Sequence, residues 1–271
     1  MNINKYQKIL LVYVVLLLIF WIALFVSNKT DSFWNYFYSF AFSLVPLIAG
    51  FGGCFLAGEW GWFKSAIGKV VFFISLGSFS WGAGSMVWSY YNFFMNVSAP
   101  YPSLADIGFV LSLPFWILGV VNLSKATGAK FSLKKKIGKI LLFMLPIIII
   151  AVSYYLLVVV ARGGVLFSIS DGFNLKLLLD LVYPIGDVIV LSLALVMFGL
   201  SVNYLGGFYK YSILAILFGF GMMYVADFVF SYTTTVGIFY NGNFGDLIFT
   251  LALSAISFGV LGFAYPKVKT H

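Results

Sequence analysis

The stretch "SLADIGFVLSLPFWILGVV", from Ser103 to Val121, contains one carboxylate, Asp106, in an otherwise apolar run. About 20 consecutive apolar residues suffice for a helix to cross the hydrocarbon core of a bilayer. Similar runs recur along all 271 residues, of which 62% are hydrophobic and 9% are charged. Soluble domains of ordinary composition are much less apolar. The sequence therefore predicts an all-α integral membrane protein, with residues 1–271 forming a single transmembrane domain.

Eight transmembrane helices are predicted from the apolar runs, and their orientation is predicted from the basic residues. The expected spans are about 8–27, 36–57, 67–95, 104–123, 139–161, 177–200, 210–233 and 244–265. With eight spans, 13 of the 16 basic residues fall on one side, and Lys29, Arg162 and Lys176 fall on the other. Lysine and arginine accumulate in cytoplasmic loops. We therefore expect both termini in the cytoplasm and the protein in the cell membrane.

An internal repeat is predicted from the comparison of Ser103–Val121 with "NFGDLIFTLALSAISFGVL", Asn243–Leu261. The two segments align without gaps, and the third and fourth spans resemble the seventh and eighth. A shift of four spans preserves orientation, so the predicted repeats, 1–123 and 139–266, are parallel. The residues that coincide are Asp106 with Asp246, Phe109 with Phe249, Leu111 with Leu251, Leu113 with Leu253, Gly119 with Gly259, and Val120 with Val260.

Five aspartates fall in or at the mouth of predicted spans, where carboxylates are costly unless they face protein or water. Ser103 and Asn243 are good N-caps, so the aspartates three residues later fit a capping box. The deeper aspartates allow two interpretations: protonated groups that only pack helices, or acids lining a polar cavity open to the outside. Pro184 predicts a kink beside them. The candidate ligand-binding residues are Asp106, Asp180, Asp187, Asp227 and Asp246, with Trp88, Tyr91 and Tyr183 as aromatic walls.

Little other chemistry is available to this chain. Cys54 is the only cysteine and His271, the last residue, the only histidine, so we expect no metal site, no cofactor and no catalytic residues. The run "KFSLKKKIGK" is expected to contact anionic lipid headgroups through Lys134, Lys135 and Lys136. Its lysines lack interleaved stacking residues, which argues against nucleic acid. The expected partners are the lipid bilayer, a cytoplasmic signalling protein and, as a homo-oligomer, further copies of the chain.

Several short motifs resemble a bacterial multi-pass sensor segment that precedes GGDEF cyclase, phosphodiesterase or kinase output domains. They are "WGAGSMVW", "PYPSLAD", "LDLVYPIGDVIVL", "YVADFVFSY" and "GNFGDLIF", and the resemblance covers roughly residues 70–265. It implies a sensing or ligand-binding module. Ser85 stands where that family often has an acid, and no output domain follows Lys269 in this sequence, so the signal is expected to pass to a partner.

Four functions are compatible with these residues. The first is a sensory or ligand-binding module with an outward-facing polar pocket, and the second is a proton- or cation-coupled transporter. A structural membrane subunit, whose acids only pack and cap helices, is the third. The fourth is an intramembrane aspartyl protease, because "PIGD" and "NFGD" resemble the GxGD signature, although Pro184 and Asn243 replace its first glycine.

Overall fold

Eight long helices make up the computed structural model, which describes residues 3–30, 32–95, 97, 99–127, 136–164, 175–201 and 209–264. All eight are long and apolar enough to cross a membrane, as the sequence predicts. Short helices follow α2 (η1, Trp62–Lys64) and α6 (η2, a π-helix at Tyr154–Val160). The long helices are α1 (Lys5–Ser27), α2 (Phe33–Glu59), α3 (Ala66–Phe94), α4 (Ala105–Ala126), α6 (Lys136–Ser153), α7 (Leu175–Ser201), α8 (Lys210–Thr235) and α9 (Phe244–Leu261).

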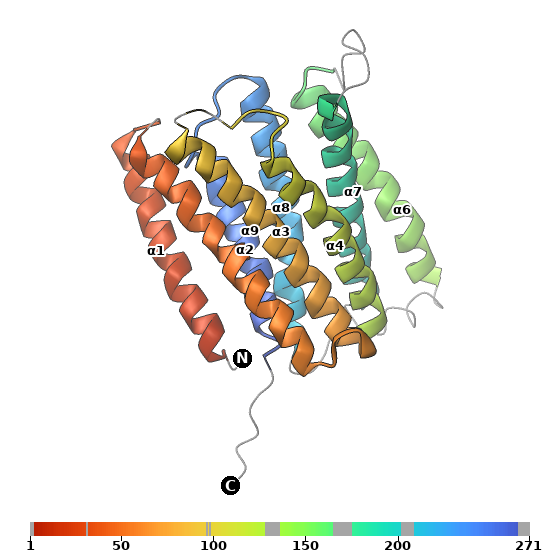
Figure 1. The fold of residues 1–271 in the computed structure, drawn as a ribbon. Helices are drawn as coiled ribbons and strands as arrows, with labels where there is room; N and C mark the ends of the chain where they lie inside the picture. The colour runs from red at the N-terminus through yellow and green to blue at the C-terminus, as the bar shows by residue number, and fades with distance from the viewer. Residues whose placement is uncertain are drawn as a thin grey trace.

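The described chain begins and ends at the same end of the bundle. Asn4 Nδ2 donates a hydrogen bond to the Leu261 carbonyl at 2.7 Å, and Gln7 Nε2 donates to the Phe258 carbonyl at 3.0 Å. Asn4 and Gln7 also form the capping box that starts α1. We call this end of the bundle, where α1 begins and α9 ends, the terminal end. The opposite end, where α4, α7 and α9 begin, is the far end (Figure 1).

The helices stand side by side, with α1 at one edge and α6 at the other (Figure 1). Between these edges α2, α3 and α4 pack in sequence, α7 packs on α4 and α8, and α9 packs on α2 and α8. The edge helix α1 contacts α2 and α9, whereas α6 contacts α7 and its π-helical continuation contacts α8. This arrangement brings α4, α7 and α8 together on the α6 side of the bundle, and the candidate site lies among them.

Close contact between α3 and α4 depends on glycine. A Cβ atom added at Gly108 of α4 would lie 2.5 Å from both the Gly84 amide nitrogen and the Ser80 carbonyl oxygen of α3. Small residues at such crossings let helix backbones approach and pack in a membrane, where apolar side chains gain little from burial against one another. The α3–α4 hairpin therefore presents the start of α4, with Asp106, to α7.

The lysines expected at the lipid surface are only partly described. Lys134 and Lys135 lie outside the described residues, while Lys136 is the first residue of α6 and is exposed at the terminal end. Lys5 and Lys8 in α1 and Lys64 between α2 and α3 lie at that end too.

Candidate functional site

Asp106, in the first turn of α4, bonds to the preceding loop and to a neighbouring helix. Its Oδ2 accepts hydrogen bonds from the Ser103 amide at 2.6 Å and the Ser103 hydroxyl at 3.2 Å, which is one half of the expected capping box. The prediction of Ser103 as the N-cap is wrong, because α4 has Leu104 as its N-cap and no side-chain capping bond. Its Oδ1 accepts a third hydrogen bond, from the Tyr183 hydroxyl of α7 at 2.6 Å. Asp106 is only 8% exposed. This carboxylate therefore joins α4 to α7 at the far end.

The carboxyl groups of Asp187 in α7 and Asp227 in α8 lie within interaction distance of one another. At a rise of about 1.5 Å per residue, Asp187 lies about 18 Å along α7 from its first residue, and Asp227 lies about 12 Å from the last residue of α8. Ionised carboxylates only accept hydrogen bonds, so a bond between two carboxyls requires a proton on one of them. Two neighbouring carboxyl groups can share one proton in this way.

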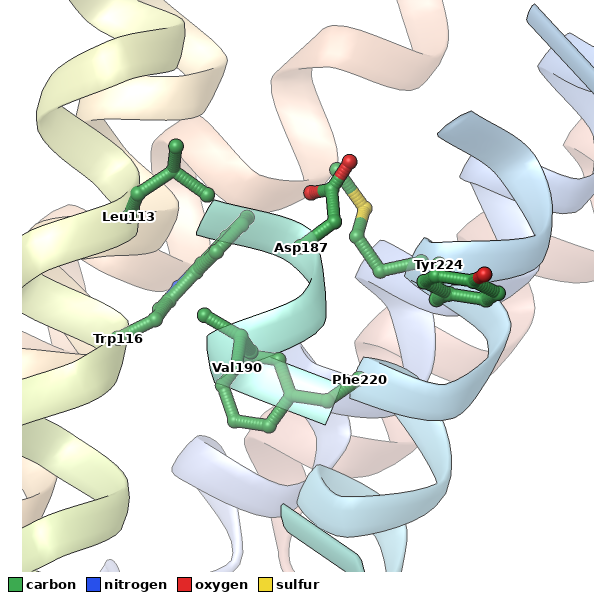
Figure 2. Close-up of a pocket in the computed structure, with 7 residues that line it drawn as sticks. Leu113, Trp116, Asp187, Val190, Phe220 and Tyr224 are labelled. Atoms are coloured by element: carbon green, nitrogen blue, oxygen red, sulfur yellow. The ribbon is translucent and has the colours of Figure 1, made fainter. Parts of the chain in front are cut away.

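A small cavity lies on the terminal-end side of this pair. It has a volume of about 10 Å³ and is lined by Asp187 together with Leu113, Trp116, Val190, Phe220, Met223 and Tyr224. Figure 2 shows the Asp187 carboxyl between Trp116 of α4 and Tyr224 of α8. A space of this size can hold about one water molecule and is too small for an organic ligand. The Tyr224 hydroxyl of α8 forms a hydrogen bond of 2.8 Å with the Ser153 hydroxyl at the end of α6. The site is therefore surrounded by α4, α6, α7 and α8.

Asp180 of α7 lies nearer the far end of the bundle than Asp187 does, and it contacts two segments from elsewhere in the chain. Its Oδ1 accepts a hydrogen bond from the Tyr101 hydroxyl at 3.0 Å and lies 4.0 Å from Nη2 of Arg162. Burial, together with the Asp180 carboxylate, raises the pKa of Tyr101, so its hydroxyl keeps the proton that it donates. Tyr101 and Arg162 were not singled out from the sequence, although Arg162 is the only arginine in the chain.

Asp246 belongs to a separate polar cluster, formed by Ser39, Trp88, Asn241 and Asp246. Its Oδ2 accepts hydrogen bonds from the Gly242 amide at 2.6 Å and from Ser39 at 3.2 Å. Trp88 Nε1 donates to Asn241 Oδ1 at 3.1 Å. As expected from the sequence, Asn243 caps α9, accepting from the Asp246 amide. This cluster fastens the loop before α9 to α2 and α3.

The sequence-derived candidates therefore divide into two groups. Asp106 and Tyr183 bond to one another, Asp187 lies beside Asp227, and Asp180 lies two turns before Asp187 on the same helix. Trp88 and Asp246 lie in the other cluster, and Tyr91 packs against Tyr90. We call Asp106, Asp180, Tyr183, Asp187 and Asp227 the carboxyl site.

The two aspartates of the GxGD-like motifs do not meet, because Asp187 pairs with Asp227 while Asp246 bonds to Ser39 and Gly242. Within the described ranges, no three histidine, cysteine, aspartate or glutamate side chains gather as metal ligands would. The carboxyl site can hold a proton, or it can bind a cation or a neutral hydrogen-bonding group. Comparison of the chain with protein-family models, curated proteins and solved structures finds no match.

Proposed function

We propose that this protein is a membrane-embedded sensory or ligand-binding module whose binding site is the carboxyl site. The observation that carries the proposal is the close approach of the Asp187 and Asp227 carboxyls within two membrane-spanning helices, with Asp187 lining a cavity. Buried carboxyls are costly in a membrane and normally serve binding, relay or pairing. Within the described part of the chain, Asp187 and Asp227 pair with each other and not with a basic residue, which leaves their charge for a ligand.

The ligand that suits this site is small and carries positive charge or hydrogen-bond donors. Every polar atom that a carboxylate presents is an acceptor. The cavity beside Asp187 has room for about one water molecule, which favours an ion of that size over an organic molecule. Asp106 and Tyr183 lie between this pair and the far end, and they would form the approach.

We further infer that the far end faces the outside of the cell and the terminal end the cytoplasm. Thirteen of 16 basic residues fall on the terminal side of an eight-span chain, which is the bias of cytoplasmic loops. The proposed parallel repeats then place Asp106 and Asp246 at equivalent positions near the outer surface. A ligand arriving from outside would change the packing of α7 and α8, and a cytoplasmic partner at the terminal end would read that change.

The proposal is tested by the thermal unfolding of the full chain in lipid nanodiscs, with Na⁺, K⁺ or NH₄⁺ replacing choline at constant ionic strength. A ligand at 100 times its Kd adds about 2.7 kcal/mol of stability, or a rise of several degrees in Tm. We expect one of these cations to raise the Tm of the wild type. Asp187→Asn and Asp227→Asn should abolish the rise, because each removes a carboxylate of the pair.

The matched control is Asp246→Asn, which alters a buried carboxyl of the separate polar cluster and should keep the full rise in Tm. An unchanged cation response in both Asp187→Asn and Asp227→Asn would refute the carboxyl site as the binding site.

A proton- or cation-coupled transporter is the second candidate, and the position of the cavity favours it. Polar groups approach the pair from the far end, while the water-sized cavity lies on its terminal-end side. A carboxyl pair with polar groups on one side and a water-sized cavity on the other could pass a proton across the membrane. Proteoliposomes loaded with a pH-sensitive dye would then show a proton flux that Asp187→Asn abolishes. Flux equal to that of empty liposomes would leave the sensory module as the function.

A further inference from the structure

Pro184 leaves one carbonyl of α7 without its helical partner. Proline has no amide hydrogen, so the carbonyl four residues earlier, that of Asp180, loses its donor within the helix. Arg162 replaces this donor, because its Nη1 donates to the Asp180 carbonyl oxygen at 3.2 Å. Nη2 of the same guanidinium lies 4.0 Å from the Asp180 carboxylate. One side chain from outside α7 thus supplies the hydrogen-bond donor that the helix lacks at the proline.

The contact lies where three segments meet. Arg162 follows the π-helix Tyr154–Val160 that continues α6, Asp180 is in the second turn of α7, and Tyr101 comes from the loop between α3 and α4. The side chains of Arg162 and Asp180 are 19% and 25% exposed. Water and salt can therefore compete for this ion pair, as they do at other partly exposed pairs.

The two sides of Pro184 are held by different partners. Before the proline, Asp180 is held by Arg162 and Tyr101. After it, Asp187 is held by Asp227 of α8. Proline is the usual cause of a sharp bend in a helix, and hinges are short positions that absorb a backbone change between two separately anchored parts. Pro184 has this arrangement, one turn from the carboxyl pair.

We propose that Arg162 is a releasable latch that holds the first turns of α7, Leu175–Tyr183, against the bundle at the Pro184 hinge. When Arg162 releases Asp180, this segment swings away from α4, and the Asp187–Asp227 pair opens toward the far end. The latch would control access to the carboxyl site, and in that respect the inference rests on the proposed function. The movement also breaks the hydrogen bonds from Tyr183 to Asp106 and from Tyr101 to Asp180, but it does not require a ligand at the carboxyl site.

Hydrogen–deuterium exchange of the full chain in nanodiscs tests the latch. Arg162→Gln removes the charged donor to the Asp180 carbonyl, and we expect the amides of residues 175–187 to exchange at least about tenfold faster. Exchange in α4 and α9 should not change. The control is Lys176→Gln, which removes another positive charge from the same end of the bundle and should leave the rates as in the wild type.

A second variant separates a latch at the proline from a general loss of stability. Pro184→Ala restores the amide hydrogen that the Asp180 carbonyl lacks, so in the double variant with Arg162→Gln most of the acceleration should disappear. Unchanged exchange in Arg162→Gln would overturn the latch, as would a double variant that exchanges as fast as Arg162→Gln alone.

These outcomes are independent of the binding test. Faster exchange in Arg162→Gln, combined with cation responses that do not need Asp187 or Asp227, would support the hinge and refute the proposed binding site. Unchanged exchange, combined with cation responses that do need them, would refute the latch and leave the binding module standing.

Discussion

At the residue scale, Asp106 and Asp246 show how much a short motif determines. Each occupies the first turn of its helix and is almost fully buried, but only Asp246 follows its N-cap, Asn243, by three positions, because the N-cap of α4 is Leu104. The capping contacts could be predicted because they depend only on neighbours in the sequence. Their other partners differ: Tyr183 of α7 for Asp106, and Ser39 of α2 for Asp246. Those partners depend on which helix packs alongside, and no local motif encodes that.

The hydrogen bond from Tyr183 to Asp106 should contribute measurably to stability. Tyr183→Phe removes the donor but keeps the ring, and hydrogen bonds to charged groups contribute about 1.5–3 kcal/mol. We expect the free energy of unfolding to fall by about that amount, measured by denaturant unfolding in mixed micelles. Tyr90→Phe is the control, because Tyr90 is 54% exposed and packs only through its ring in the described contacts. Equal stability of the two variants would argue against the α4–α7 contact.

At the scale of elements, the contact between α3 and α4 sets the position of the carboxyl site. Gly108 follows Asp106 by two residues and lies against the backbone of α3 at Gly84 and Ser80. The sequence shows where the glycines lie, and glycines permit helices to approach closely. It could not say which of them face a neighbouring helix, because a glycine in lipid and a glycine at a helix crossing look alike in an apolar sequence.

Gly108→Ala should separate α3 from α4, because the new methyl group would overlap backbone atoms that cannot move aside. Overpacking of this kind costs about 1–3 kcal/mol. Gly221→Ala in α8 is the matched control: no heavy atom lies within 4 Å of the added Cβ, so the substitution should be neutral or stabilise by up to about 1 kcal/mol. Thermal unfolding of both variants measures the difference. A Gly108→Ala protein as stable as Gly221→Ala would contradict this packing of α3 on α4.

At the scale of the whole molecule, the number of helices was predictable and their neighbours were not. Hydropathy summed over 20 residues is a strong signal, so the eight predicted spans agree with the eight helices to within a few residues at most ends. Lipid-facing and core-facing residues are both apolar: α1 buries Leu10 and Val14 and exposes Ile9 and Val12. Sequence patterns therefore could not show that α7 packs against α4 and α8, or that Asp187 lies beside Asp227 and not beside Asp246.

The pairing of Asp187 with Asp227 is the central claim, and a double-mutant cycle tests it most directly. Asp187→Ala and Asp227→Ala should each destabilise the protein, because each leaves the other carboxyl inside the bundle without its partner. The double variant has no unpaired carboxyl at this position. Its loss of unfolding free energy should therefore be smaller than the sum of the two single losses by about 0.5–3 kcal/mol, the range for residues in contact. Strictly additive losses would contradict the pairing and, with it, the proposed binding site.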